Sequence, residues 1–143
     1  AQPAQPGRRQ NFDKVNYYTI RGNAPAGMGI FMYEPLTVIG VDEPRTMYGL
    51  LAAAMKIEPD KSAITFRLNP KAHFSNGDPV TAADVKYSFD SLSGKYASPT
   101  YSSALVGVRE AKVIDGGVLS IVNDTGPTVV AHARASVTVT VSA

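Results

Sequence analysis

The chain has 143 residues, a formal net charge of +2 from 14 basic and 12 acidic residues, and a hydrophobic fraction of 44%. That length suits one domain, which can bury roughly two-thirds of the surface that its unfolded chain exposes. The balanced charge argues against nucleic acid or an anionic membrane as a partner. No apolar run approaches the ~20 residues of a membrane span. The absence of cysteine excludes disulfides and thiolate metal sites.

Residues 1–14 lack hydrophobic periodicity, and we expect them to form an extended arm. The arm opens with AQPAQPG, which is polar and has no initiator Met, charged n-region or apolar h-region. Such a leader is typical of a protein whose secretory signal has been removed. The sequence therefore predicts an exported, periplasmic protein. The alternative is a chain that begins within a longer gene.

The next segments are short. Val15–Ile20 is β-prone, and a loop rich in Gly, Asn and Pro follows it over residues 21–29. Residues 30–36 suit either a short helix that ends at Pro35 or a buried strand, because periodicity cannot separate these over so few residues. The alanine-rich segment Leu50–Met55 predicts an apolar turn of helix.

The clearest strand is Ser62–Leu68, in which Ile64, Phe66 and Leu68 alternate with more polar residues and face one side. The upstream residues Met55–Glu58 can pair with it through the intervening Pro-Asp-Lys turn. A β-hairpin is therefore expected here.

A segment rich in turn and helix-cap residues follows the hairpin, over residues 74–90. Asn76 and Gly77 predict a tight turn with positive φ, where glycine has no Cβ to clash, and Pro79 restricts the residue before it to extended geometry. Thr81 stands where a helix N-cap belongs, and Asp84 can return the bond as in a capping box. These five residues are predicted to be structural. One face of the following helix is predicted to be core, through Val85, Phe89 and Leu92.

The C-terminal part contains two further β signals. Residues 111–122 indicate two strands around an Asp-Gly-Gly turn. From Thr125 to the end only Arg134 is charged, and Val137–Val141 alternates strictly between valine and threonine. This pattern predicts a half-buried strand, which should pair internally or with a partner because an unpaired edge aggregates.

Several motifs resemble one known family. Ile64–Leu68 followed by Ala72–Phe89 is similar to the pattern TFxLRxxxxFxDGxPVTAxDVxxSF of the family 5 extracellular solute-binding proteins. These are the oligopeptide, dipeptide and nickel receptors of bacterial ABC importers. Tyr33–Leu36 and Tyr48–Ala52 resemble flanking elements of the same family. The resemblance covers about residues 11–123. Asn16–Gly22 and Asp42–Pro44 look most like the branch whose members bind larger or microcin-type peptides.

The resemblance implies an α+β fold: a partial lobe of a type II periplasmic-binding-protein fold, with a mixed sheet and a few short helices. It implies three parts, an arm over residues 1–14, the first part of lobe I over 15–124, and a divergent β-strand tail over 125–143. Such proteins capture a ligand between two lobes, and the loop after the first strand contacts it. That loop corresponds to residues 20–23 here.

Four residues could line a remnant ligand groove. They are Arg21, Asn23, Met28 and Tyr33, with ordinary loop and packing roles as the alternative. Arg21 stands where some members place an acid that can meet a peptide's amino terminus. A cation cannot hold an ammonium group, so the substrate class of this chain is an open question.

No constellation supports catalysis or a metal. His73 and His132 are the only histidines and lack a third ligand at metal spacing. Asp78 and Asp84 form a carboxylate pair only if their capping roles are ignored, and no Gly-x-Ser-x-Gly elbow occurs. The sequence predicts no enzyme and no cofactor. Tyr96 and Tyr101 flank a polar-aromatic loop of the kind enriched at interfaces.

Family members are several times longer, and one incomplete lobe cannot close on a solute by a hinge. We therefore expect a non-catalytic module that acts by protein contact, as an accessory subunit docked on a larger periplasmic or membrane-anchored complex. Peptide is a further expected partner. The alternative is a fragment of a peptide-binding receptor of an ABC importer.

Overall fold

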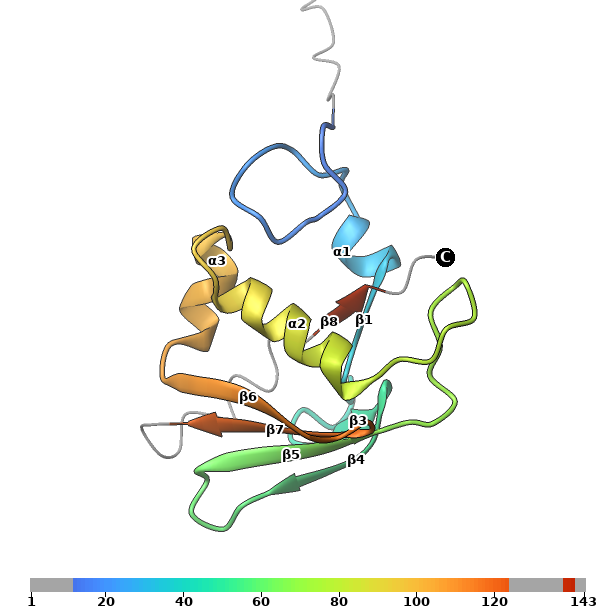
Figure 1. Ribbon diagram of the computed structural model, residues 1–143, viewed down its shortest axis with the longest axis vertical. Coiled ribbons are helices and arrows are strands. Elements are labelled where there is room, and N and C mark those ends of the chain that lie inside the picture. The colour runs from blue at the N-terminus through green and yellow to red at the C-terminus, as the bar shows by residue number, and fades with distance from the viewer. Residues whose placement is uncertain (1–11, 124–137, 141–143) are drawn as a thin grey trace, which may run out of the picture.

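A computed structural model describes residues 12–123 and 138–140, and its centre is a four-stranded sheet with helix α2 across one face (Figure 1). Two sheets of two strands each accompany it. In chain order the elements are α1 (Met28–Phe31), β1 (Tyr33–Pro35), β2 (Thr37–Ile39), β3 (Met47–Gly49), β4 (Ala52–Ile57), β5 (Ala63–Leu68), α2 (Ala82–Ser93), α3 (Pro99–Ser102), the 3-10 turn η1 (Ser103–Leu105), β6 (Val108–Asp115), β7 (Val118–Asn123) and β8 (Thr138–Thr140).

The four-stranded sheet has the order β4-β5-β7-β6. The two hairpins predicted from the sequence are confirmed, since β4 pairs with β5 and β6 pairs with β7. The register aligns Phe66 with Met55 on β4 and with Leu119 on β7. Directly paired residues share a face of the sheet, so these three side chains point to the same side. That side is the core.

The core fills the space between this face of the sheet and α2. As predicted, α2 buries Val85, Phe89 and Leu92. Their spacing places them on one face of the helix, which lies against the sheet. The buried apolar cluster consists of Leu36, Leu51, Ala52, Ile64, Phe66, Leu68, Val80, Ala82, Val85, Phe89, Ala111, Leu119 and Ile121.

The alanine-rich segment is a strand, and the prediction of a helical turn over Leu50–Met55 is wrong. The backbone N–H groups of Leu50 and Ala52 both donate to the carbonyl of Leu36 at 3.0 Å. From Ala52 the segment pairs with β5, with a register shift between Ala52 and Ala54. These backbone hydrogen bonds and the burial of Leu51 outweigh the helix propensity of alanine, which is only a weak preference.

The turn and the helix cap before α2 fold as the sequence predicts. Gly77 has φ +91°, and the Asn76 side chain both donates to the Asp78 carboxylate at 2.6 Å and accepts from its N–H at 3.1 Å. The Asp84 carboxylate accepts from the N–H of Thr81 at 2.8 Å and from its hydroxyl at 2.6 Å. The Asp84 N–H donates back to the Thr81 hydroxyl at 3.4 Å, which completes the capping box.

Replacing Thr81 by alanine should lower the free energy of unfolding by about 1 kcal/mol, because the first turn of α2 loses its side-chain acceptor. Thr81→Ser should retain most of the stability. Thr100 is exposed, and its side chain makes no such cap, so Thr100→Ala is the control. Urea denaturation of the three variants gives the comparison. Equal losses for Thr81→Ala and Thr100→Ala would show that the cap contributes nothing.

The N-terminal elements are less regular than predicted. The β-prone segment Val15–Ile20 forms only an isolated bridge, between Thr19 and Ala97. The two alternatives for residues 30–36 each hold in part, since α1 ends at Phe31 and β1 follows directly. The β2–β3 hairpin was not predicted, because its strands have three residues each and too short a pattern to detect.

The valine–threonine segment contains the strand β8, which pairs with β1 from Tyr33–Thr140 to Pro35–Thr138. The predicted C-terminal strand thus pairs internally, while Val137 and Val141 lie outside the described residues. The fold class is α+β. The strand pairs within the described ranges are antiparallel, so the parallel neighbours of a mixed sheet are not found in this part of the chain.

Candidate functional site

Four tyrosine rings form a connected cluster between the N-terminal loop (residues 12–27), β1 and α3. Tyr18 lies at its centre, with ring centroids 5.6 Å from Tyr17, 5.0 Å from Tyr33 and 4.7 Å from Tyr101. Tyr17 also meets Tyr101 at 5.6 Å. All four contacts are edge-to-face, the arrangement that the ring quadrupoles favour. The cluster is therefore a specific packing unit.

Backbone hydrogen bonds place the two halves of this cluster together. The Ile20 N–H donates to the Tyr96 carbonyl at 2.9 Å, and the Ser98 N–H donates to the Tyr18 carbonyl at 2.7 Å. The N-terminal loop is thereby held alongside the segment that leads from α2 into α3. This pairing brings Tyr17 and Tyr18 to Tyr101 across about 80 residues of sequence.

An open groove of about 460 Å³ lies on one side of the cluster. Its volume falls within the range of roughly 300–1,000 Å³ that is typical of solute pockets. Its walls are polar and aromatic: the N-terminal loop forms one and the start of α3 the other. The residues that line it are Lys14, Tyr17, Thr19, Ile20, Gly22, Ser98, Pro99, Thr100 and Tyr101.

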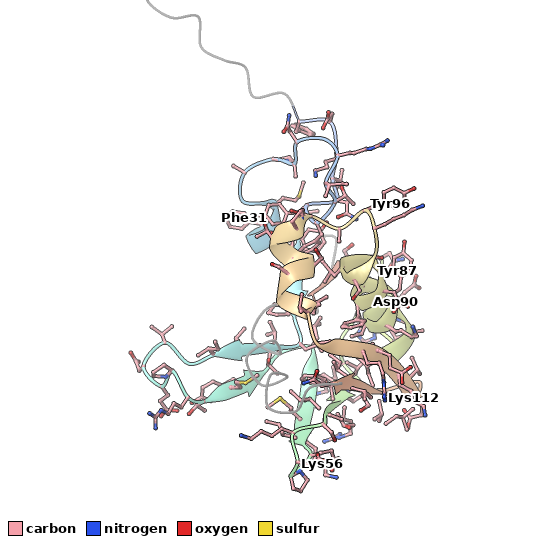
Figure 2. The ribbon with its side chains drawn as sticks, turned by 90° about the vertical axis from the view of Figure 1, so that its left-hand side faces the viewer. Phe31, Lys56, Tyr87, Asp90, Tyr96 and Lys112 are labelled. Atoms are coloured by element: carbon pink, nitrogen blue, oxygen red, sulfur yellow. The ribbon has the colours of Figure 1, made fainter. Side chains whose placement is uncertain are left out.

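A second hollow of about 70 Å³ lies between the cluster and α2. It has room for a few water molecules, and is too small for an organic solute. Tyr87, which contributes to its rim, projects from α2 on the same side of the molecule as Tyr96, opposite Phe31 (Figure 2). The residues that line this hollow are Asn16, Tyr18, Thr19, Tyr33, Tyr87, Ser88, Ser91 and Leu92.

The wall of the groove formed by the N-terminal loop is fixed by short-range contacts. The Lys14 ammonium donates to the Thr19 carbonyl at 2.5 Å and to its hydroxyl at 3.4 Å. The Asp13 carboxylate accepts from the Asn23 N–H at 2.6 Å. Gly22 has φ +81°, and a Cβ there would lie 2.5 Å from Asp13 Oδ1. A residue with a Cβ would be strained at this φ, so the turn favours glycine.

Tyr101 keeps its proton in this setting. Partial burial raises its pKa, and the hydrogen bond with Tyr17 together with the nearby Tyr17 and Tyr18 rings raises the pKa further. The phenol is therefore neutral at physiological pH and remains a hydrogen-bond donor.

The structure places the four predicted ligand residues in different surroundings. Tyr33 is buried in the cluster, and its hydroxyl donates to the Val15 carbonyl at 3.3 Å. Arg21 and Asn23 are exposed on either side of Gly22, which lines the groove, but neither is itself part of the lining. Met28 is half-buried in α1 and lies outside the lining of both hollows. The structure thus does not gather the four into one site, and a ligand role for them stays a prediction.

Sequence reasoning missed Lys14, Tyr17 and Tyr18, and it identified Tyr101 only as an interface residue. Tyr17 and Tyr18 had an available signal, since this pair lies one residue before the loop that the family resemblance assigned to ligand contact. What the sequence lacked was the pairing of Tyr18 with the segment at Ser98.

Among the remaining candidates from the sequence, His73 and Asp84 make local structural contacts. Within residues 12–123 and 138–140, no group of three or more His, Cys, Asp or Glu side chains could hold a metal. His73 Nδ1 lies 2.6 Å from the Lys71 carbonyl in an exposed loop, and His132 lies outside the described residues. The carboxylate of Asp84 caps α2, as described above. None of the helices described is both long and apolar enough to cross a membrane.

Comparison with known proteins identifies the family. The sequence model of the bacterial extracellular solute-binding proteins, family 5 (Middle), matches residues 46–142. This match runs past Asn123, where the sequence had suggested that the likeness ends. The chain is 36% identical over 121 residues to the peptidoglycan-binding protein YepA of Agrobacterium fabrum, covering 79% of this chain and 20% of YepA. It is 32% identical over 102 residues to the probable peptide-binding protein YejA of the same organism, covering 71% of this chain and 16% of YejA.

Solved structures agree on the fold. The oligopeptide-binding protein AppA of Bacillus subtilis, in complex with a nonapeptide, superposes with a TM-score of 0.68 at 14% identity, covering 82% of this chain and 23% of AppA. NikA of Brucella suis, in complex with Fe(III)-EDTA, gives a TM-score of 0.67 at 22% identity, covering 80% of this chain and 22% of NikA. The fold is thus part of a periplasmic-binding-protein fold. The chain spans about a fifth of the length of the YepA relative. It belongs to the bacterial extracellular solute-binding proteins of family 5.

Proposed function

We propose that this chain is a non-catalytic peptide-binding part of a family 5 receptor, and that peptide contacts the groove beside the tyrosine cluster. The observation that carries the proposal is the groove of about 460 Å³, walled by Tyr17 and Tyr101. Tyrosine offers a large apolar ring and a hydroxyl at little conformational cost, which suits ligands that combine amides with varied side chains. The hydroxyl residues Ser98 and Thr100 add hydrogen-bonding capacity along the groove.

The relatives support a peptide over other solutes. YepA is named for peptidoglycan binding and YejA for peptide binding, while AppA was solved with a nonapeptide. NikA, by contrast, holds a chelated metal, so the fold alone does not select the ligand. The tyrosine-walled groove favours the peptide class.

The groove described here, with both its walls, forms one side of the proposed site. Because the YepA relative is about five times longer, we propose that family polypeptide beyond this part of the fold covers the open side of the groove. We retain the division into an arm over 1–14, a partial lobe over 15–124 and a β-strand tail over 125–143 as a proposal. The family is extracellular by description, and we propose export to the periplasm.

Replacing Tyr101 by alanine should weaken peptide binding by about 2- to 10-fold, the effect of losing one aromatic wall. Isothermal titration with tetra-alanine, and with peptides released from peptidoglycan by digestion, measures this. Tyr96→Ala is the matched control, because Tyr96 is exposed and lies outside the lining of the groove. Its binding should be unchanged.

Thermal denaturation separates binding from folding in this comparison, since Tyr101 also packs on Tyr17 and Tyr18. Tyr101→Phe keeps the ring and should retain most of the affinity. Binding that is unchanged in a folded Tyr101→Ala variant would place the peptide elsewhere. Absence of binding by the unmodified chain would contradict the proposed function.

A second function, the accessory subunit, is favoured by one observation. The β2–β3 hairpin and its flanks expose large apolar side chains: Val38, Ile39, Val41, Tyr48 and Leu50. Val38 pairs directly with Tyr48, so their exposed side chains share one face of the hairpin, and an exposed apolar face of this kind suits a protein contact. Purification from the native source without denaturant decides between the two functions. Co-migration with a larger complex in fixed stoichiometry would support the subunit, and a free 15.2 kDa monomer would exclude it.

A further inference from the structure

We propose that the groove binds a carboxylate group of the peptide, and that Lys14 is the residue that receives it. This inference rests on the proposed function and specifies which part of the ligand enters the groove. It follows from the position of the Lys14 ammonium, the charges around the groove and the hydroxyl groups beside it.

The Lys14 ammonium is positioned by the loop that carries it. Its two hydrogen bonds run to the carbonyl and the hydroxyl of Thr19, which also lines the groove. An ammonium group has three N–H donors. Two are used by Thr19, so one is left for a ligand. Because these bonds already restrict the long side chain, ligand binding costs less conformational entropy than it would with a free lysine.

No acidic side chain neutralises this ammonium within the part of the chain that the structure describes. The ion pairs there join Lys56 to Glu58, Lys86 to Asp90, and Arg109 to Glu110. The neighbouring Asp13 directs Oδ1 to the Asn23 N–H.

The lining of the groove contains no Asp or Glu, and Lys14 is its one charged member among the described residues. Outside the lining, the carboxylate of Asp13 lies beside Gly22 and the exposed Arg21 precedes Gly22 in the chain, so these two opposite charges offset each other and Lys14 decides the sign. A peptide offers an ammonium group at one end and a carboxylate at the other. Coulomb repulsion disfavours the first in this groove and attraction favours the second.

Neutral hydrogen-bond donors along the groove suit the same ligand group, a carboxylate. Ser98 and Thr100 also line the groove, and a carboxylate accepts hydrogen bonds from hydroxyl groups such as theirs. The chemistry recognised is thus a carboxylate, which a peptide carries at its C-terminus or on an acidic side chain. The test distinguishes these two sources.

Titration calorimetry should compare tetra-alanine with a free C-terminus against its C-terminal amide. We expect the free acid to bind about 5- to 10-fold more tightly, the effect of one charge-assisted contact in a partly exposed site. A third probe, Ala-Ala-Glu-Ala amide, carries its carboxylate on a side chain. Recovery of the affinity with this probe would assign the site to acidic side chains, and no recovery would assign it to the peptide terminus.

Variants at Lys14 locate the preference. Lys14→Met should bring the acid-to-amide affinity ratio close to one, while Lys14→Arg, which keeps the charge, should retain it. Lys95→Met is the matched control, because Lys95 lies over the Tyr96 ring and outside the groove. Thermal denaturation confirms that each variant is folded.

Two results would overturn the inference and leave the proposed function standing. One is equal binding of the acid, the amide and the glutamate probe by the unmodified chain. The other is a preference for the acid that persists in folded Lys14→Met. If none of the three peptides binds, the proposed function fails and the carboxylate site fails with it.

Discussion

Replacing Phe66 by alanine is expected to lower the free energy of unfolding by about 3–5 kcal/mol, the range for removing a buried aromatic ring. Phe66 is 1% exposed and lies on β5, with β4 on one side and β7 on the other. Its neighbours across the sheet are Met55 and Leu119, and it belongs to the core between the sheet and α2. Paired strands on both sides limit how far the backbone can move to refill the cavity, so the upper part of the range is expected.

The matched control for this substitution is Phe31→Ala. Phe31 projects from α1 into solvent and is 80% exposed (Figure 2). Its replacement should change the free energy of unfolding by no more than about 0.5 kcal/mol. Urea denaturation followed by far-ultraviolet circular dichroism measures both variants, since the chain has no tryptophan. A loss below about 1 kcal/mol for Phe66→Ala would contradict the core as described.

The second large effect is expected at Gly49, the last residue of β3. A Cβ built on Gly49 would overlap the carbonyl oxygen of Ala52, a backbone atom that cannot swing aside as a side chain can. Gly49→Ala must therefore move the turn that leads from the β2–β3 hairpin into β4. Overpacking of this kind costs about 1–3 kcal/mol. Thermal and urea denaturation should both show the loss.

Gly116→Ala is the control for Gly49→Ala. Gly116 lies in the Asp-Gly-Gly turn between β6 and β7, and a Cβ there would meet no atom within 4 Å. Its replacement should be neutral, or stabilising by a few tenths of a kcal/mol through the lower entropy of the unfolded chain. Equal stability of the two variants would show that the approach of Ala52 to Gly49 is not close.

The elements that the sequence predicted well are those with local, strong signals. The capping box of Thr81 and Asp84 acts within one turn of helix, and the alternation of Ile64, Phe66 and Leu68 requires only a strand with one buried face. Both involve neighbouring residues and hold in any compact fold. The family pattern coincides with this stretch, because it consists largely of the same turn, cap and strand signals.

The elements that the sequence did not predict depend on distant partners. Alanine propensity favoured a helix at Leu50–Met55, yet the Leu36 carbonyl and strand β5 hold this segment extended. The groove has the same origin. Tyr17 and Tyr101 approach where backbone hydrogen bonds, among them that from the Ser98 N–H to the Tyr18 carbonyl, join two distant segments. Patterns of single residues contain no information on such contacts. The sequence therefore showed the neighbours Tyr17 and Tyr18, but not that Tyr101 packs against them.

The central claim, that peptide binds beside the tyrosine cluster, is tested most directly by NMR of the ¹⁵N-labelled chain titrated with tetra-alanine. The account predicts that amide shifts change in residues 14–22 and 98–101, the two walls of the groove. Changes confined to the β2–β3 hairpin, or no changes at millimolar peptide, would contradict it.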